Sequence, residues 1–130
     1  MFYEFSLVVP ANTPVTSPVS LAAKLVPGTI DAVEIQFWAG QRGNVHVRIL
    51  DRQHQLWPTN LGDWITSDAY TVTFIEQYVL SEIPHTLHIH AYNEDTDYEH
   101  EIIVRFSVSI GRWTLEDLAR LLTGPVEVVD

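Results

Sequence analysis

Hydrophobic and polar residues alternate along most of this chain. Near the N-terminus, Tyr3, Phe5 and Leu7 alternate with Glu4 and Ser6. The same period of two returns in residues 19–25, 33–38, 45–49, 70–79, 87–91 and 102–110. This alternation is typical of strands that bury one face and expose the other. We therefore predict an all-β fold, an antiparallel β-sandwich or jelly roll of about seven to eight strands.

Two segments depart from this period. Residues 54–68, HQLWPTNLGDWITSD, are irregular and leave room for one short strand in each half. Near the C-terminus, Thr114 and Asp117 resemble a capping box, apolar residues follow at helical spacing, and Gly124-Pro125 ends the pattern. We predict a β-sandwich domain over residues 1–112. A short helix and tail over residues 113–130 would pack on it or on a neighbouring subunit.

The charge balance restricts the partners of the chain. It carries 17 Asp and Glu against 7 Lys and Arg, a formal net charge of −10. Such a surface repels phosphate, so we expect neither nucleic acid nor an anionic membrane as a partner. The absence of cysteine excludes disulfides and thiolate metal sites. The first residues lack the basic region of a signal peptide, and we expect synthesis in the cytoplasm.

The run HTLHIHAYNEDTDYEHE at residues 85–101 has the composition of a metal site. On a strand, His88, His90 and Tyr92 point to one side. With Glu94, the histidines form H-x-H-x3-E, which resembles part of the first metal motif of the cupin family. The flanking glycines of that motif are replaced by Glu82 and Glu101, and its second half does not follow. We predict neutral rings on a solvent-facing or interface-facing surface, with the metal set His88, His90 and Glu94 as the alternative.

The acidic part of the same run spans residues 93–101. Asp95, Asp97 and Glu99 follow one another at a spacing of two, which superficially suggests calcium. An EF-hand loop needs a glycine at its sixth position and a helix on each side, and neither is present. We predict the tip of a hairpin between two long strands, kept acidic to remain solvated and to discourage edge pairing. Weak calcium binding stays open.

The aromatic residues are the better indication of a binding surface. Trp38 falls on the polar side of its strand, and Trp57 and Trp64 flank the irregular segment. Exposed tryptophans are typical of ligand or partner surfaces, although Trp57 and Trp64 could equally plug an open end of the sandwich. Ile103 also lies on the polar side of its strand. The interface or ligand candidates are Trp38, Trp57, Trp64, His88, His90, Tyr92 and Ile103.

No motif in the sequence predicts catalysis. The chain has neither a G-x-S-x-G nucleophile motif, nor a phosphate-binding loop, nor a dinucleotide fingerprint. We therefore predict a protein that is not an enzyme and needs no cofactor. Two binding functions remain: self-association through apolar residues on the exposed strand faces, and carbohydrate binding on Trp38, Trp57, Trp64 or Tyr92. A cupin-like metalloprotein is the third and weakest hypothesis.

Residues 27–64, PGTIDAVEIQFWAGQRGNVHVRILDRQHQLWPTNLGDW, resemble segments of small phage and prophage proteins. Those proteins resemble virion accessory or decoration-type β-sandwich subunits. We predict a structural subunit that associates with itself, as a trimer or larger ring, and with other structural proteins of a particle. The resemblance implies such a structural role. It also implies that the protein resides in a virion or another assembled particle.

Overall fold

The computed structural model describes residues 1–110, and within them the chain is all-β. The bounds of the strands are β1 Phe2–Val9, β2 Val19–Lys24, β3 Gly28–Phe37, β4 Val45–Asp51, β5 His54–Trp57, β6 Tyr70–Leu80, β7 Thr86–Asn93 and β8 His100–Ser109. The predicted count of seven to eight strands is confirmed. The predicted helix and tail at residues 113–130 lie outside the described residues. Within those residues, no helix is long and apolar enough to cross a membrane.

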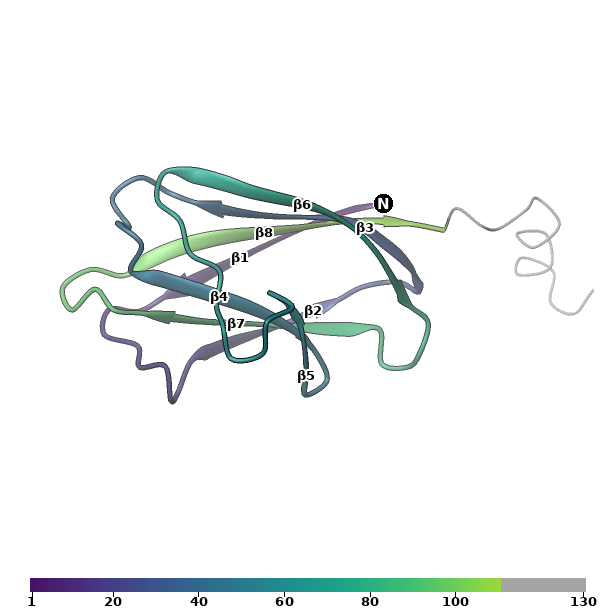
Figure 1. Ribbon diagram of the computed structural model, residues 1–130, viewed down its shortest axis with the longest axis horizontal. Coiled ribbons are helices and arrows are strands. Elements are labelled where there is room, and N and C mark those ends of the chain that lie inside the picture. Colours follow the sequence, from purple (N-terminus) through teal and green to yellow (C-terminus); the bar gives the residue numbers. More distant parts are fainter. Residues whose placement is uncertain (111–130) are drawn as a thin grey trace, which may run out of the picture.

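The strands form two antiparallel sheets of four strands each (Figure 1). One sheet has the order β1-β8-β3-β6, and the other has the order β2-β7-β4-β5. Strands far apart in the sequence therefore become neighbours. The first strand pairs with the last from Phe2↔Ser107 to Val9↔His100, and β2 pairs with β7. Because β1 and β8 lie side by side, the N-terminus and the end of β8 lie close together (Figure 1).

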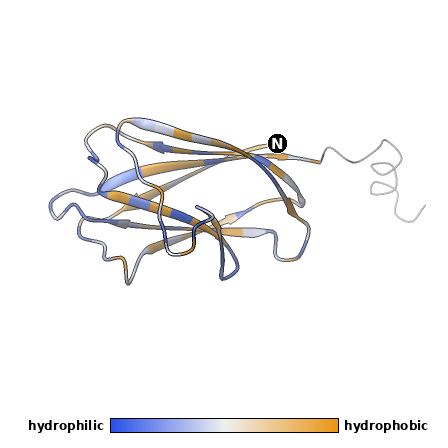
Figure 2. Ribbon diagram, in the orientation of Figure 1, coloured by the Kyte–Doolittle hydropathy of each residue, from blue (hydrophilic) through white to orange (hydrophobic). Residues whose placement is uncertain are grey.

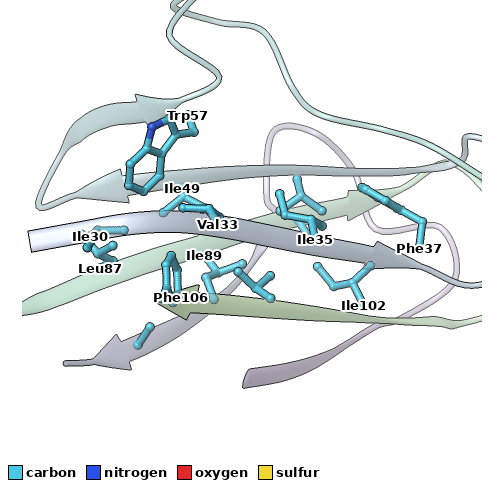
Figure 3. Packing of buried hydrophobic residues seen from close by; sticks show 14 of the residues in the cluster. Ile30, Val33, Ile35, Phe37, Ile49, Trp57, Leu87, Ile89, Ile102 and Phe106 are labelled. Atoms are coloured by element: carbon cyan, nitrogen blue, oxygen red, sulfur yellow. The ribbon is translucent and has the colours of Figure 1, made fainter. Parts of the chain in front are cut away.

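The inward sides of both sheets form one apolar core. Ile35 of β3 and Val104 of β8 come from the first sheet, and Ile49 of β4 and Ile89 of β7 come from the second. All are fully buried, and Figure 3 shows the core side chains gathered between the strands. Burying one such side chain stabilises the fold by roughly 1.5–3 kcal/mol. The alternation seen in the sequence thus yields a sandwich-like arrangement, with orange and blue stripes along the strands (Figure 2).

Strand β3 is longer than the sequence indicates. Its alternation begins at Val33, but its hydrogen-bonded pairing begins at Gly28. An irregularity between Ile30 and Ala32 shifts the register against both neighbours, which hides the period of two. A Cβ atom on Gly28 would lie 2.7 Å from the carbonyl oxygen of Ser109. Glycine is therefore required for β3 to approach β8 at this point.

The irregular segment at residues 54–68 forms only one strand. Its first half is β5, which pairs with β4. Its second half contributes a single bridge, in which Ile65 and Val47 exchange two backbone hydrogen bonds of 2.7 and 2.8 Å. This bridge fixes the segment against the side of β4 that faces away from β7, the side on which β5 also pairs. Trp64, the residue before it, is thereby held at the outward side of the second sheet.

Candidate interaction surfaces

Strand β7 presents four polar side chains on its outward side, beginning with Thr86. His88, His90 and Tyr92 are half-buried there, whereas Leu87 and Ile89 between them are fully buried. The register with β4 places His46 opposite Tyr92 and Arg48 opposite His90. Together with the nearby Trp64, these residues form what we call the histidine face, which consists of His46, Arg48, Trp64, His88, His90 and Tyr92.

The aromatic rings of the histidine face pack against one another. The rings of His46 and Tyr92 are stacked, with centroids 4.4 Å apart and planes 7° apart. Trp64 meets Tyr92 at 90°, with centroids 4.7 Å apart. A sugar-stacking site would need exposed coplanar rings, whereas these rings cover each other. Trp64 and Tyr92 therefore do not form a flat platform for a sugar.

The guanidinium of Arg48 lies over the ring of Trp64, without a carboxylate partner among residues 1–110. Its Cζ atom is 4.3 Å from the centroid of Trp64, which is a cation–π contact. Its Nη2 atom lies 3.4 Å from Nδ1 of His90, and its buried Nε atom has no hydrogen-bond partner among the described residues. Within residues 1–110 it forms no ion pair with any acidic side chain. Among the described residues, the guanidinium thus contacts the π-face of Trp64 and the ring of His90 but no carboxylate.

The surroundings of His90 favour its neutral form. Burial lowers the pKa of the imidazole, and the positive charges of Arg48 and His88 lower it further. A neutral ring can accept the hydrogen bond that Arg48 offers to Nδ1. The histidine face therefore carries one permanent cation beside a histidine that resists protonation.

The cupin-like ligand set is not assembled. Glu94 contacts Nε2 of His46 at 2.6 Å, on the neighbouring strand. Among residues 1–110, no group of three or more His, Asp or Glu side chains lies close enough to hold a metal ion together. His88 and His90, which share the H-x-H-x3-E pattern with Glu94 in the sequence, are thus not the partners of Glu94 in the fold.

The predicted hairpin tip at residues 93–101 is wrong, because β7 and β8 lie in different sheets and this acidic segment connects the two sheets. The carboxylate of Asp95 builds the turn of this connection. Asp95 accepts backbone hydrogen bonds from Asp97 (2.9 Å) and Tyr98 (3.2 Å), and it contacts Nε2 of His100 at 2.9 Å. These contacts lower the pKa of the Asp95 carboxyl, with the Asp97 hydrogen bond as the largest cause. The buried amide of Asn93 donates to the carbonyl oxygen of Tyr98 at 3.0 Å. Both carboxylate oxygens of Asp95 are therefore engaged by groups of the chain itself.

The outward side of the other sheet is organised around Arg105. Its register places Glu4 of β1 on one side and Glu34 of β3 on the other. The carboxylates lie 3.5 and 3.6 Å from the guanidinium, which also donates a hydrogen bond of 2.8 Å to Gln36. Ile103 lies one rank further along, between Ser6 and Gln36, and is half-buried. We call this outward side of β1-β8-β3-β6 the ion-pair face.

An uncharged rank crosses the ion-pair face beside these charges. The register aligns Phe2, Ser107, Ala32 and Ile75 across all four strands. Phe2 is 61% exposed and Ile75 is 81% exposed, and the two residues between them are small. The large apolar side chains of Phe2 and Ile75 thus stand at the two edges of the sheet, with only small side chains between them. Val79 extends the exposed apolar area along β6.

The three tryptophans within residues 1–110 occupy different environments. Trp57 is 5% exposed and packs in the core against Phe74 and Tyr78, so it is a core residue and not an interface or ligand residue. Figure 3 shows its ring directed into the cluster. Trp38 is 44% exposed at the end of β3, where it lines a hollow of about 260 Å³ together with Tyr70.

A polar cavity of about 530 Å³ lies at the turn between β4 and β5. Asp51 in its wall accepts a hydrogen bond from the hydroxyl of Tyr78, and Arg52 pairs with Glu82 at 2.9 Å on the exposed rim. Burial, followed by the contact with Asp51, raises the pKa of Tyr78 to about 12. Tyr78 is therefore a neutral donor at ordinary pH, and the pair closes this end of the core.

Two residues of the histidine face, His46 and Arg48, are missed as site residues by the sequence patterns. The alternation places both residues on the polar side of β4, but nothing in the sequence says that β4 pairs with β7. Comparison with models of known protein families and with curated proteins gives no match. The candidate surfaces are therefore interpreted from their own geometry.

Proposed function

We propose that this protein is a non-enzymatic structural subunit that associates with copies of itself. The nested strand order supports a jelly roll as its specific fold, because β1 lies beside β8, β2 beside β7, β3 beside β6 and β4 beside β5. Jelly rolls occur in viral capsid proteins and also in lectins and cupins. The fold alone thus leaves the function open, and the surfaces must decide it.

The observation that carries the proposal is the pair of exposed apolar side chains at the two ends of the uncharged rank on the ion-pair face. Ile75 and Phe2 stand exposed at its two ends, on a chain whose net charge of −10 would otherwise keep copies apart. A monomer rarely presents such side chains as one aligned group, because they gain free energy when they leave water. Burial against another copy accounts for them.

The more specific form of the proposal is a decoration-type accessory subunit of a phage particle, assembled as a trimer or larger ring. The resemblance of residues 27–64 to phage and prophage proteins supports this form. Its partners would be other copies and further structural proteins of the particle, and its location would be the assembled particle. Electron microscopy of particles isolated from the source organism, with antibody labelling of this chain, tests that location.

Self-association is tested by sedimentation velocity over a wide range of protein concentration. We expect the wild type to form a defined oligomer and Ile75→Asn to shift it towards the monomer. Ile83→Asn is the matched control, because Ile83 is 83% exposed but lies in the loop between β6 and β7. A wild type that stays monomeric at every concentration, or two variants that behave alike, would contradict the proposal.

A second candidate function is carbohydrate binding, and the hollow beside Trp38 favours it. Trp38 and Tyr70 are both exposed large aromatic residues in its lining. Aromatic rings beside polar groups are typical of sugar contacts. A glycan array tests this candidate: binding that is lost in Trp38→Ala and kept in Trp64→Ala would support it. Silence of the wild type across the array removes it.

A further inference from the structure

Arg48 differs from other arginines of this protein in its lack of a carboxylate partner among the described residues. The chain has 17 acidic residues and 7 basic ones, and Arg52 and Arg105 each contact a carboxylate. Arg48 is half-buried, yet it contacts none within the described range. Taking a cation partly out of water without a counter-ion is unfavourable. A carboxylate from outside the chain would relieve that state.

The strand next to β7 leaves access to this region. Ser20, Ala22 and Lys24 of the edge strand β2 point outward, are exposed, and lie opposite His90, His88 and Thr86 respectively. Two of the three are small, so β2 forms a low border. We call this area the cationic floor, which consists of Ser20, Ala22, Lys24, His88, His90 and Arg48. None of its residues is acidic.

On the ion-pair face, the carboxylates of Glu4 and Glu34 make only long contacts with the one cation that they share. Glu4 and Glu34 share one cation, Arg105, which leaves a net charge of −1 among the three side chains. Their distances of 3.5 and 3.6 Å exceed the roughly 2.7–2.9 Å of a strong charge-assisted hydrogen bond. The carboxyl-bearing side chains are also 54% and 35% exposed. Both can therefore accept a further donor.

We infer that the cationic floor of one copy docks on the ion-pair face of a second copy, with Arg48 donating to Glu4 or Glu34 of that copy. The inference rests on the proposed self-association and names its two surfaces. Charge complementarity supports it, because cations without carboxylates would meet carboxylates that share one cation. The same contact would bury the exposed rank between Phe2 and Ile75.

Such a contact has a definite consequence for symmetry. The two surfaces are different, and they lie on opposite sides of the two-layered molecule (Figure 1). A contact between different surfaces is heterologous, so each docked copy leaves one floor and one face free. Copies would add head to tail and give a ring where the rotation closes or a filament where it does not. A symmetric dimer through two ion-pair faces would instead stop at two.

The test uses two double variants that each disable one surface. The floor variant is Arg48→Gln with Lys24→Gln, and the face variant is Glu4→Gln with Glu34→Gln, so that the two disabled surfaces do not attract each other. We expect each to be monomeric alone, and an equimolar mixture to form a 1:1 dimer and nothing larger. Native mass spectrometry distinguishes the two chains by mass. Arg52→Gln with Arg42→Gln is the matched control for charge and should assemble as the wild type does.

The outcomes separate this inference from the function on which it rests. If the wild type assembles but the mixture stays monomeric, or if a folded floor variant still assembles alone, the docking mode is wrong while self-association stands. A wild type that remains monomeric removes both. If the wild type stays monomeric and binds heparin, and the floor variant does not, the cationic floor serves a sulfated glycan and the inference is overturned. Circular dichroism before each measurement confirms that the variants are folded.

Discussion

The two outward faces of this molecule handle a central arginine in different ways. On the ion-pair face, Arg105 lies between two carboxylates supplied by its neighbouring strands. On the histidine face, Arg48 lies against the ring of Trp64 and contacts no carboxylate of the described residues. The first arrangement depends on opposite charges, and the second depends on packing. The difference teaches that similar positions on two sheets can respond to mutation for different physical reasons.

The largest expected effect concerns the packing on the histidine face. We expect Trp64→Ala to lower the free energy of unfolding by about 2–3 kcal/mol, because the ring supports both Tyr92 and Arg48. Trp38→Ala, at the end of β3, should lower it by less than about 0.5 kcal/mol, since that side chain is exposed. Urea unfolding followed by circular dichroism measures both. Equal effects would show that the histidine face is not held by its aromatic packing.

Removing each arginine charge separately tests the difference between the two faces. Arg105→Met should lower the free energy of unfolding by about 1 kcal/mol, because it leaves Glu4 and Glu34 facing each other without a cation. Arg48→Met should change it by no more than about 0.5 kcal/mol. Loss of the cation–π contact would be offset by removal of a buried nitrogen without a partner. Thermal unfolding at low protein concentration, where copies are apart, provides the measurement, and a reversed order would contradict the contrast.

The smallest expected effect is a pH dependence on the histidine face. Burial and the charges of Arg48 and His88 lower the pKa of His90 in the folded chain from its ordinary value of 6.5. Between that lowered pKa and about 6.5, the unfolded chain binds more protons than the folded chain. Stability therefore rises with pH across this window and falls as the solution becomes more acidic.

The substitution His90→Gln should weaken that dependence. Urea unfolding at pH 7.5 and pH 5.5 gives the two free energies for each variant. His54→Gln provides a control, because His54 is exposed at the start of β5, away from Arg48 and His88. An unchanged difference between the two pH values in His90→Gln would show that the acid sensitivity arises elsewhere.

The sequence predicted the strands well because the period of two is a local property. It also predicted that His88, His90 and Tyr92 share one outward side, since parity within a strand needs no partner. It could not predict that His46 and Arg48 lie beside them, because strand pairing between β4 and β7 is non-local. The same limit explains Glu94, whose partner His46 comes from another strand.

The tryptophans illustrate a second limit of the sequence. Trp57 and Trp64 flank one irregular segment, but one lies in the core and the other lies on a surface. The single bridge between Ile65 and Val47 decides where the second ring goes. Such a bridge involves one residue of the segment and leaves no repeating pattern to detect.

The nested strand order also restricts when this chain can fold during synthesis. Within the part of the chain that the structure describes, strand β1 pairs only with β8, and β2 pairs only with β7. The first two strands therefore have no partner until residues beyond 86 have left the ribosome. Only the hairpin of β4 and β5 pairs strands that are adjacent in sequence. Phe5, Leu7 and Leu21 in these two strands therefore remain without their native strand partners until the last two strands have been synthesised.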